Sequence, residues 1–300
     1  MKTVLAICLI AITFSGAAQR AFAQTEPVIQ SYSLDVEAKL LSDRKNRGIS
    51  DTFNGPGAEI NITAVHESGF VGYLQLGTVS KTLFVGGNGA QVTAALGYRG
   101  GQSDAFHYGV GFAQEWFPGA KVENAPTNID WATGEPTGLV DTKFDSSFAL
   151  IEFGYGILEG RYLYVLSKDF RGNNTATLCG GTYLPAVLAG GDPANAISCY
   201  GDQYKNSGGS HLLDLDMKYA LNGQTKLLAH LGYQKIKNFS GLDAWDYRLG
   251  LLHTRWGLDF SAEVVGAHLN NRDFAVVTDS SGQSKKMDRT TLVLAVAKRF

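Results

Sequence analysis

The sequence has no long apolar segment beyond its first residues, and it has little proline. The chain of 300 residues contains 7 prolines, 36 glycines and 11% aromatic residues, and its mean hydropathy is -0.06. After residue 23 no apolar run approaches the ~20 residues that a membrane-spanning helix needs, which excludes a helical membrane protein. The composition suits a β-protein instead, because aromatic side chains pack well on sheets and proline does not fit inside them.

A strong charge of one sign is also missing. The formal net charge is -2, and it becomes -4 without residues 1–23, which contain Lys2 and Arg20 but no acid. Such a mild balance gives no reason to expect nucleic-acid binding.

Cysteine is scarce, with 3 residues in the chain, of which Cys179 and Cys199 lie beyond the first 23 residues. In an oxidising compartment we expect these two to form one disulfide. Two free thiols in a loop are the alternative.

The first 23 residues have the pattern of a Sec-type signal peptide. Lys2 forms a short basic region, residues 4–14 are apolar, and Ala21-Phe22-Ala23 offers a cleavage site before Gln24. Cleavage after Ala18 is a weaker alternative. A lipoprotein box at residues 5–8 is disfavoured, because Ile7 occupies the position that needs a small residue. We therefore expect an exported protein with one domain, residues 24–300.

Beyond the signal peptide, apolar and polar residues alternate with the period of two that is typical of β-strands. In one segment Trp245, Tyr247 and Leu249 alternate with Asp246 and Arg248. Twelve such segments are predicted: 30–43, 58–66, 69–78, 91–99, 105–117, 143–155, 158–169, 211–220, 225–236, 244–254, 257–268 and 290–300.

The connections between these segments alternate in length. The short ones are 67–68, 100–104, 156–157, 221–224 and 255–256. The long ones are 44–57, 79–90, 118–142, 170–210, 237–243 and 269–289. Short turns at one end and long loops at the other are the plan of an outer-membrane barrel. We therefore predict an all-β fold, a 12-stranded antiparallel transmembrane β-barrel with short periplasmic turns and long surface loops.

Two further patterns favour a membrane barrel over a soluble β-sandwich, which would also alternate. The final segment, 290–300, is apolar on one face and suits a strand that closes the sheet. Aromatic residues also gather near segment ends, as the interface girdles of a barrel do. These pairs are Phe106 and Tyr108, Trp116 and Phe117, Phe153 and Tyr155, and Trp245 and Tyr247.

Four short segments carry a resemblance to a known family. They are Arg47-Gly48-Ile49-Ser50, His66-Glu67-Ser68-Gly69-Phe70, Lys168-Asp169-Phe170 and Val296-Ala297-Lys298-Arg299-Phe300. In order and spacing they resemble the TorF family of outer-membrane porin-like proteins, most of which are uncharacterised. Asn46 departs from the aromatic residue usual in that family, and the 170–210 loop is longer than typical. The resemblance implies a barrel and a porin-like role, but it implies no known substrate.

In a barrel of this kind the polar face of each strand points into the lumen. The predicted inward acids are Asp35, Glu37, Glu59, Glu115, Glu152, Glu159, Asp214, Asp216, Asp246, Asp259 and Glu263. The predicted inward bases are Lys39, Arg161, Lys218, Lys226 and Arg248, which His230 joins at low pH. Eleven acids against five bases favour cations in an open pore. The phase of 143–155 and 158–169 is ambiguous, which leaves Glu152, Glu159 and Arg161 open.

A plugged lumen is the alternative to an open pore. Twelve strands make a narrow barrel, and opposite charges could pair across it, with Lys39 and Arg248 as candidate partners for the acids. The 170–210 loop is either an external cap or a constriction that folds inward, and a Cys179–Cys199 disulfide would stabilise it by roughly 3 kcal/mol.

Signs of catalysis are weak. Ser210 and His211 are adjacent and so cannot point together from a strand, and no nucleophile-elbow motif is present. The histidines show no metal-ligand spacing: His66, His107, His211, His230, His253 and His268.

We therefore expect a porin for passive diffusion of small hydrophilic solutes, with no enzymatic activity, cofactor or metal. The expected partners are outer-membrane lipids, those solutes and, through the C-terminal strand, the barrel-assembly machinery. A plugged structural or adhesive barrel is the second hypothesis, and an outer-membrane hydrolase the third.

Overall fold

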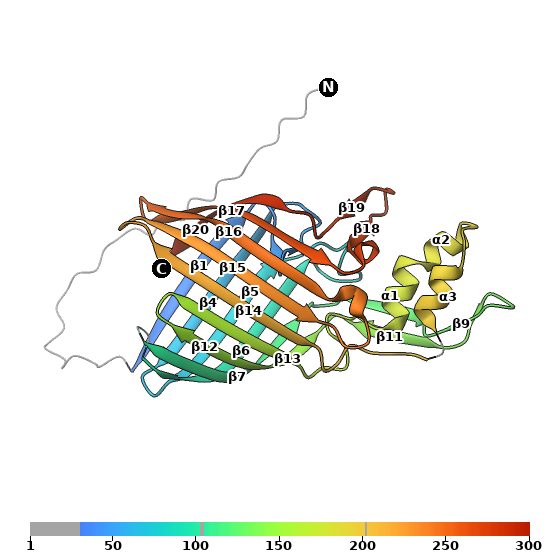
Figure 1. The fold of residues 1–300 in the computed structure, drawn as a ribbon, viewed down its shortest axis with the longest axis horizontal. Helices are drawn as coiled ribbons and strands as arrows, with labels where there is room; N and C mark the ends of the chain where they lie inside the picture. Colours follow the sequence, from blue (N-terminus) through green and yellow to red (C-terminus); the bar gives the residue numbers. More distant parts are fainter. Residues whose placement is uncertain (1–30, 103–104, 202) are drawn as a thin grey trace, which may run out of the picture. The chain divides into compact units, whose positions relative to one another are not determined.

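The computed structural model describes residues 31–102, 105–201 and 203–300. The predicted signal peptide, residues 1–23, lies outside the described residues. Within the unit 32–300, twelve antiparallel strands form a closed barrel (Figure 1). They are β1 (Tyr32–Leu41), β4 (Gly57–His66), β5 (Phe70–Thr78), β6 (Ala90–Gly101), β7 (Phe106–Trp116), β12 (Ser146–Tyr155), β13 (Leu158–Val165), β14 (His211–Ala220), β15 (Thr225–Lys235), β16 (Ala244–Arg255), β17 (Leu258–Leu269) and β20 (Thr291–Arg299).

Each barrel strand pairs with its neighbours in the sequence, and the first and last strands pair with each other. In this closing pair Lys39 lies opposite Ala297 and Leu41 opposite Ala295. The predicted fold class is therefore confirmed, including a final strand that closes the sheet. The short connections lie at one end of the barrel, called here the turn end, and the long ones at the other, the loop end (Figure 1).

One predicted strand, 158–169, is shorter than expected, because β13 ends at Val165. The hydroxyl of Ser167 donates a hydrogen bond to the carbonyl of Asp169 at 2.7 Å, a local bond that competes with sheet pairing. Arg171 then adopts a left-handed backbone conformation, with φ of 47°. The chain therefore turns into a loop before residue 169.

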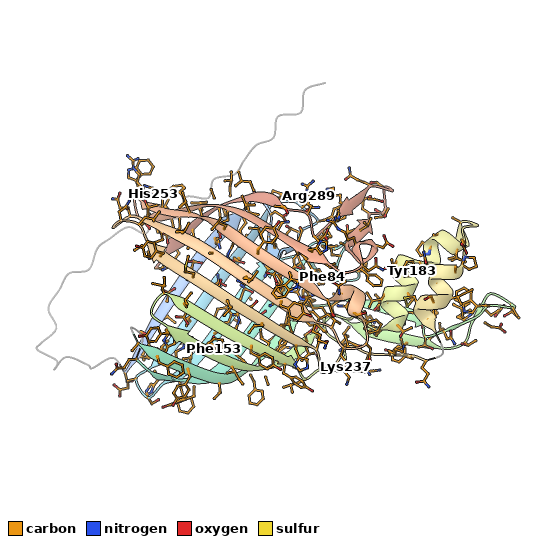
Figure 2. The ribbon with its side chains drawn as sticks, in the orientation of Figure 1. Phe84, Phe153, Tyr183, Lys237, His253 and Arg289 are labelled. Atoms are coloured by element: carbon orange, nitrogen blue, oxygen red, sulfur yellow. A yellow bond between two sulfur atoms is a disulfide. The ribbon has the colours of Figure 1, made fainter. Side chains whose placement is uncertain are left out.

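The outer face of the barrel is apolar. Leu96 on β6 and Phe112 on β7 are 74% and 68% exposed, although neither carries a polar atom on its side chain. Such a surface is costly in water and suits the hydrocarbon layer of a bilayer. Aromatic side chains frame the turn end of this face, where His253 is also labelled in Figure 2. These exposed aromatic residues are Tyr32, Phe70, Tyr98, Phe106, Tyr108, Tyr155, Trp256 and Phe300.

The long loops carry small elements of their own, which the period-two pattern did not predict. They are β2 (Lys45–Asn46), β3 (Ile49–Ser50), β8 (Lys121–Pro126), β9 (Ile129–Asp130), β10 (Glu135–Pro136), β11 (Leu139–Lys143), α1 (Thr175–Thr182), α2 (Leu184–Leu188), α3 (Ala194–Tyr200), η1 (Ser240–Leu242), η2 (Arg272–Ala275), β18 (Val276–Thr278) and β19 (Ser284–Lys286). None of the helices in the described residues is long and apolar enough to cross a membrane.

The 170–210 loop forms three short helices that lie beyond the loop end of the barrel (Figure 1). The predicted Cys179–Cys199 disulfide is confirmed and joins α1 to α3, with the two Cα atoms 5.6 Å apart. Tyr200 is buried beside it and packs against Trp131 of the preceding loop, at 6.1 Å between ring centroids. The disulfide thus holds a small helical unit together against the strands β8 and β9.

Candidate functional site

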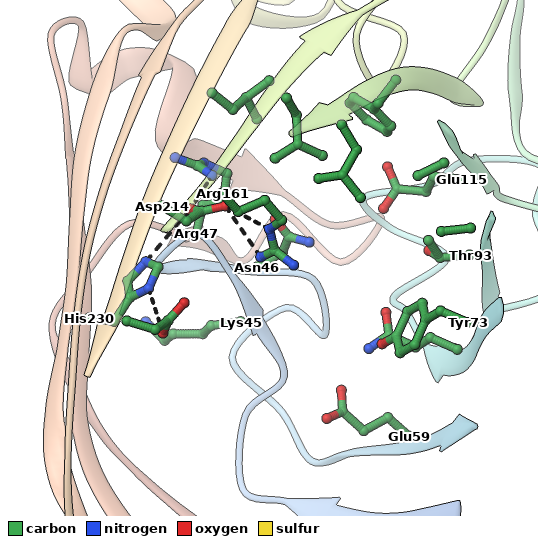
Figure 3. Close-up of a pocket in the computed structure, with 18 of the residues that line it drawn as sticks. Lys45, Asn46, Arg47, Glu59, Tyr73, Thr93, Glu115, Arg161, Asp214 and His230 are labelled. Carbon is green, nitrogen blue, oxygen red and sulfur yellow. Dashed lines mark hydrogen bonds and ion pairs between the residues drawn. The ribbon is translucent and has the colours of Figure 1, made fainter. Parts of the chain in front are cut away.

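A cavity with a volume of about 570 Å³ lies inside the barrel. Side chains from the barrel strands and from two loops line it, and most of them are polar (Figure 3). The predicted lumen residues that line this cavity are Lys39, Glu59, Glu115, Glu152, Arg161, Asp214, Asp216, His230, Asp246, Arg248 and Glu263. The ambiguous phase of strands β12 and β13 is thereby resolved for Glu152 and Arg161, which face inward.

The other predicted lumen residues do not line this cavity. Strand alternation places them on the inner face toward the turn end, where Glu37 pairs with Arg299 at 3.1 Å and Glu159 with His107 at 2.9 Å. The members of this second group are Asp35, Glu37, Glu159, Lys218, Lys226 and Asp259.

A short hairpin from the first long loop reaches into the cavity. It consists of β2, β3 and the turn between them, residues 45–50, and is called here the lumen hairpin. Arg47 and Gly48 form the turn with φ of 48° and 72°, the left-handed pair that a two-residue hairpin turn needs. Glycine is also required at position 48 by space, because a Cβ there would lie 2.2 Å from the carbonyl oxygen of Gly266 on β17. The hairpin tip is therefore pressed against the barrel wall.

Arg47 extends from this tip to the inner wall formed by β14, β15 and β16. Its guanidinium donates to a carboxylate oxygen of Asp214 and to the carbonyl oxygens of Leu213 at 3.0 Å and Tyr233 at 2.9 Å. A carboxylate oxygen of Asp246 lies 3.5 Å away. Figure 3 shows Arg47 and Asp214 together on one side of the pocket. The side chain of Arg47 is only 9% exposed, so these contacts replace most of its water.

The same wall continues as a ladder of alternating charges. His230 places Nδ1 3.0 Å from Asp216 and Nε2 2.9 Å from Asp246. Arg248 then connects Asp216, at 2.9 Å, to Glu263, at 3.2 Å. An ionised carboxylate only accepts hydrogen bonds, so His230 satisfies both neighbours when both of its ring nitrogens carry protons.

Arg171 enters the cavity from the start of the 170–210 loop and binds two carboxylates. It contacts Glu115 on β7 at 2.6 and 2.9 Å, and Asp51 in the first loop at 3.0 and 3.4 Å. Burial opposes the charge of Arg171, but Asp51 and Glu115 outweigh it and raise the pKa of the guanidinium above its usual value. The residue therefore acts as a permanently charged clamp between the two loops and the wall.

The base of the lumen hairpin is fixed by two more basic side chains. Arg44 contacts Asp51 at 3.1 Å and Glu59 at 3.4 Å. Lys45 donates to the carbonyl oxygen of Arg289 at 2.6 Å. Burial lowers the pKa of Lys45, and the charge of its neighbour Asp43 only partly opposes this effect. The base of the hairpin is thus tied to Asp51, to Glu59 on β4 and to the loop that precedes β20.

The opposite wall, on β4, β5 and β6, is mostly neutral and polar, with Glu59 and Arg99 as its charged residues. Tyr73 and Gln75 both donate to the side-chain oxygen of Asn61 at 2.9 Å, and Thr93 follows on the next strand. Tyr73 and Thr93 lie across the pocket from Arg47 (Figure 3). The cavity therefore has one densely charged wall and one wall on which neutral hydrogen-bonding side chains predominate.

Sequence reasoning missed the bases that pair with many of the lumen acids. Arg44, Arg47 and Arg171 lie in segments expected to be loops, and period-two alternation gives no information about where loop side chains point. Arg99 and Arg299 lie on strands, and their phase relative to their neighbours would have placed them inside. Within residues 31–102, 105–201 and 203–300, ten of the eleven predicted lumen acids have an arginine, lysine or histidine nitrogen within 4.0 Å, the exception being Asp35.

A family model for bacterial proteins of unknown function, Gcw_chp, matches residues 26–300. The chain therefore belongs to this family. The narrower resemblance to the TorF family stays a prediction. No curated protein matches the chain.

Several solved structures of outer-membrane channels have a similar fold. The KdgM porin has a TM-score of 0.45 and 8% identity, over 89% of this chain and 99% of that chain. The NanC porin has a TM-score of 0.46 and 8% identity, over 88% and 98%. An outer-membrane channel from Pseudomonas putida F1 has a TM-score of 0.41 and 11% identity, over 92% and 100%. Likeness at this level concerns the barrel architecture and carries no information about solutes.

Proposed function

We propose that this protein is an outer-membrane porin through which small hydrophilic solutes diffuse passively, with a mild preference for cations. The observation that carries the proposal is a closed barrel whose outer face is apolar and whose inner face surrounds a polar cavity of about 570 Å³. A bilayer accepts such an outer face, and water or polar solutes in the lumen would solvate the charged inner face. No cofactor takes part.

The expected cation preference is small, because the loops offset part of the acidic charge. On the strands, eleven inward acids face seven inward bases once Arg99 and Arg299 are added. The loops add four bases (Arg44, Lys45, Arg47 and Arg171) and two acids (Asp43 and Asp51), which removes half of that difference. Fixed charge in a narrow lumen sets selectivity, so a weak excess of acids supports a weak preference.

The proposed pore-lining residues are those of the cavity together with the inward residues at the turn end. In this view the turn end faces the periplasm, and the barrel-assembly machinery engages β20 during insertion. The proposed pore is narrowest where the lumen hairpin crosses it, so that access depends on the loops.

Liposome swelling tests the proposal. Purified protein refolded into liposomes should admit small neutral and charged solutes, with rates that fall steeply as the solute grows. Heat-denatured protein is the control. Correctly folded barrels whose liposomes exclude even the smallest solute would contradict the proposal.

A second candidate, a plugged barrel that acts through its surface loops, is favoured by the extensive pairing of lumen charges. Pairing offsets part of the cost of burying charge, whereas an unpaired buried charge is far more expensive, so a closed lumen would need such pairing. A folded barrel without conductance, whose loops bind a partner surface, would favour this candidate over the porin.

A further inference from the structure

Four hydrogen-bond acceptors converge at one place on the inner wall. They are carboxylate oxygens of Asp214 and Asp246 and the main-chain carbonyl oxygens of Leu213 and Tyr233. The two carboxylate side chains are only 4% and 2% exposed. This group of four acceptors, called here the cation receptor, is built entirely from β14, β15 and β16.

Two other side chains orient the carboxylates of the cation receptor. Arg161 lies 3.3 Å from Oδ2 of Asp214, and His230 lies 2.9 Å from Oδ1 of Asp246. The remaining oxygens, Oδ1 of Asp214 and Oδ2 of Asp246, are the ones directed at Arg47. The wall itself therefore fixes two negative oxygens beside two carbonyl oxygens, whether or not Arg47 is in place.

This arrangement matches a guanidinium group. A guanidinium is planar, carries several N–H donors and binds carboxylates and carbonyls at the same time. Asp246 Oδ2 accepts no hydrogen bond from the described residues, although Arg47 Nη2 lies 3.5 Å away. Arg47 therefore leaves one buried acceptor of the cation receptor without a hydrogen bond. A ligand that is free to adjust its position could donate to all four acceptors.

The present occupant belongs to a short element. The lumen hairpin has only two residue pairs, Lys45 with Ser50 and Asn46 with Ile49. Its base is fixed through Lys45 and Arg44, but rotation of the Arg47 side chain alone would vacate the cation receptor. The cavity of about 570 Å³ borders it and provides the approach, because Arg47, Asp214 and Asp246 all line that cavity.

We infer that the cation receptor is a binding site for solutes that carry a guanidinium group, and that Arg47 occupies it as a built-in competitor. The inference rests on the proposed function, because the solute reaches the site through the lumen. An incoming solute displaces the Arg47 side chain, which then moves into the cavity. The site would give this channel a preferred class of solute in addition to a weak general preference for cations.

The test uses L-arginine as the probe and L-citrulline, its neutral analogue of the same shape, as the control solute. Block of single-channel current is measured for the wild type, Arg47→Ala and Arg47→Ala with Asp246→Asn. Arg255→Ala, at a turn outside the cavity, is the control variant. L-arginine should block Arg47→Ala about tenfold more tightly than the wild type, in line with the energies of buried charge pairs. The second substitution should abolish this gain, and L-citrulline should not block any variant.

Equal block of the wild type and Arg47→Ala would overturn the inference while leaving the porin proposal intact. Calorimetric titration of L-arginine into each folded variant in detergent micelles separates the remaining cases, because it needs no conductance. Binding by Arg47→Ala without any channel current would contradict the porin proposal and support the cation receptor. Channel current from Arg47→Ala without binding of L-arginine would support the porin proposal and contradict the cation receptor.

Discussion

At the scale of single residues, the lumen depends on arginines that two loops carry inward. Arg47 and Arg171 join carboxylates that lie far away in the sequence, and Arg44 joins the nearer Asp51 and Glu59. Removing one member of such a buried group leaves its partners charged and unpaired, which is far more costly than the pairing itself is favourable. These loop arginines should therefore dominate the response of the barrel to substitution.

Arg171→Ala should lower the free energy of unfolding by about 3 kcal/mol, because Glu115 would remain buried without a cation and Asp51 would keep only Arg44. Arg171→Lys should lose less, since lysine keeps the charge but not the paired geometry. Urea unfolding of the refolded barrel, followed by tryptophan fluorescence, measures both. An unchanged midpoint for Arg171→Ala would show that the clamp has no structural role.

Asp214→Asn combined with Asp216→Asn should weaken the cation preference, because it removes two inward negative charges while Arg161 and Arg248 remain. The reversal potential in a salt gradient should move toward zero. Asp141→Asn in an exposed loop removes a charge outside the cavity and should leave the potential unchanged. An open channel whose potential ignored the double substitution would show that this strand does not face the conduction path.

At the scale of elements, the lumen hairpin and the helical loop perform different tasks. The hairpin lies inside the barrel and narrows it, whereas most of the 170–210 loop lies beyond the barrel and only its first residues turn inward. Both elements owe their positions to a few contacts, so each can be disturbed without breaking strand pairing.

Gly48→Ala should displace the lumen hairpin and raise the conductance, because the new Cβ would lie 2.2 Å from the Gly266 carbonyl oxygen. Gly282→Ala is the matched control. Gly282 also has a positive φ, of 84°, but a Cβ there meets nothing within 4 Å. Single-channel recording compares the two. Equal conductance in Gly48→Ala and the wild type would mean that the hairpin does not restrict the path.

Replacing both Cys179 and Cys199 by serine should loosen the helical loop by about 3 kcal/mol, the stabilisation expected for a ring of this length. Limited proteolysis should then cut within the loop faster, while the barrel strands stay resistant and the conductance stays unchanged. A loss of barrel folding in this variant would instead show that the loop takes part in forming the barrel.

Sequence periodicity predicted the strands well and the loops poorly, for a physical reason. A barrel strand has one face in lipid and one in the lumen, so alternation marks it directly, as Trp245 and Asp246 do on β16. A loop residue such as Arg47 has no such periodic constraint. Its place inside the barrel comes from a turn that only the pair Arg47 and Gly48 indicates, and from acids on distant strands.

At the scale of the whole molecule, the proposed pore is a restricted channel rather than a wide sieve, because the barrel is narrow, its charges are paired and a hairpin is inserted in it. Twelve strands give a lumen between the side-chain-filled barrels of eight strands and the open barrels of sixteen or more. Within that lumen the hairpin and the clamp of Arg171 leave a cavity of about 570 Å³. The central claim is that this space conducts.

The most direct test of that claim is the single-channel current of the refolded protein in a planar bilayer under a salt gradient. The account predicts stepwise current of small amplitude and a reversal potential whose sign shows a weak preference for cations. A correctly folded barrel that inserts but passes no current would contradict it, and would leave the plugged barrel acting through its loops as the better description.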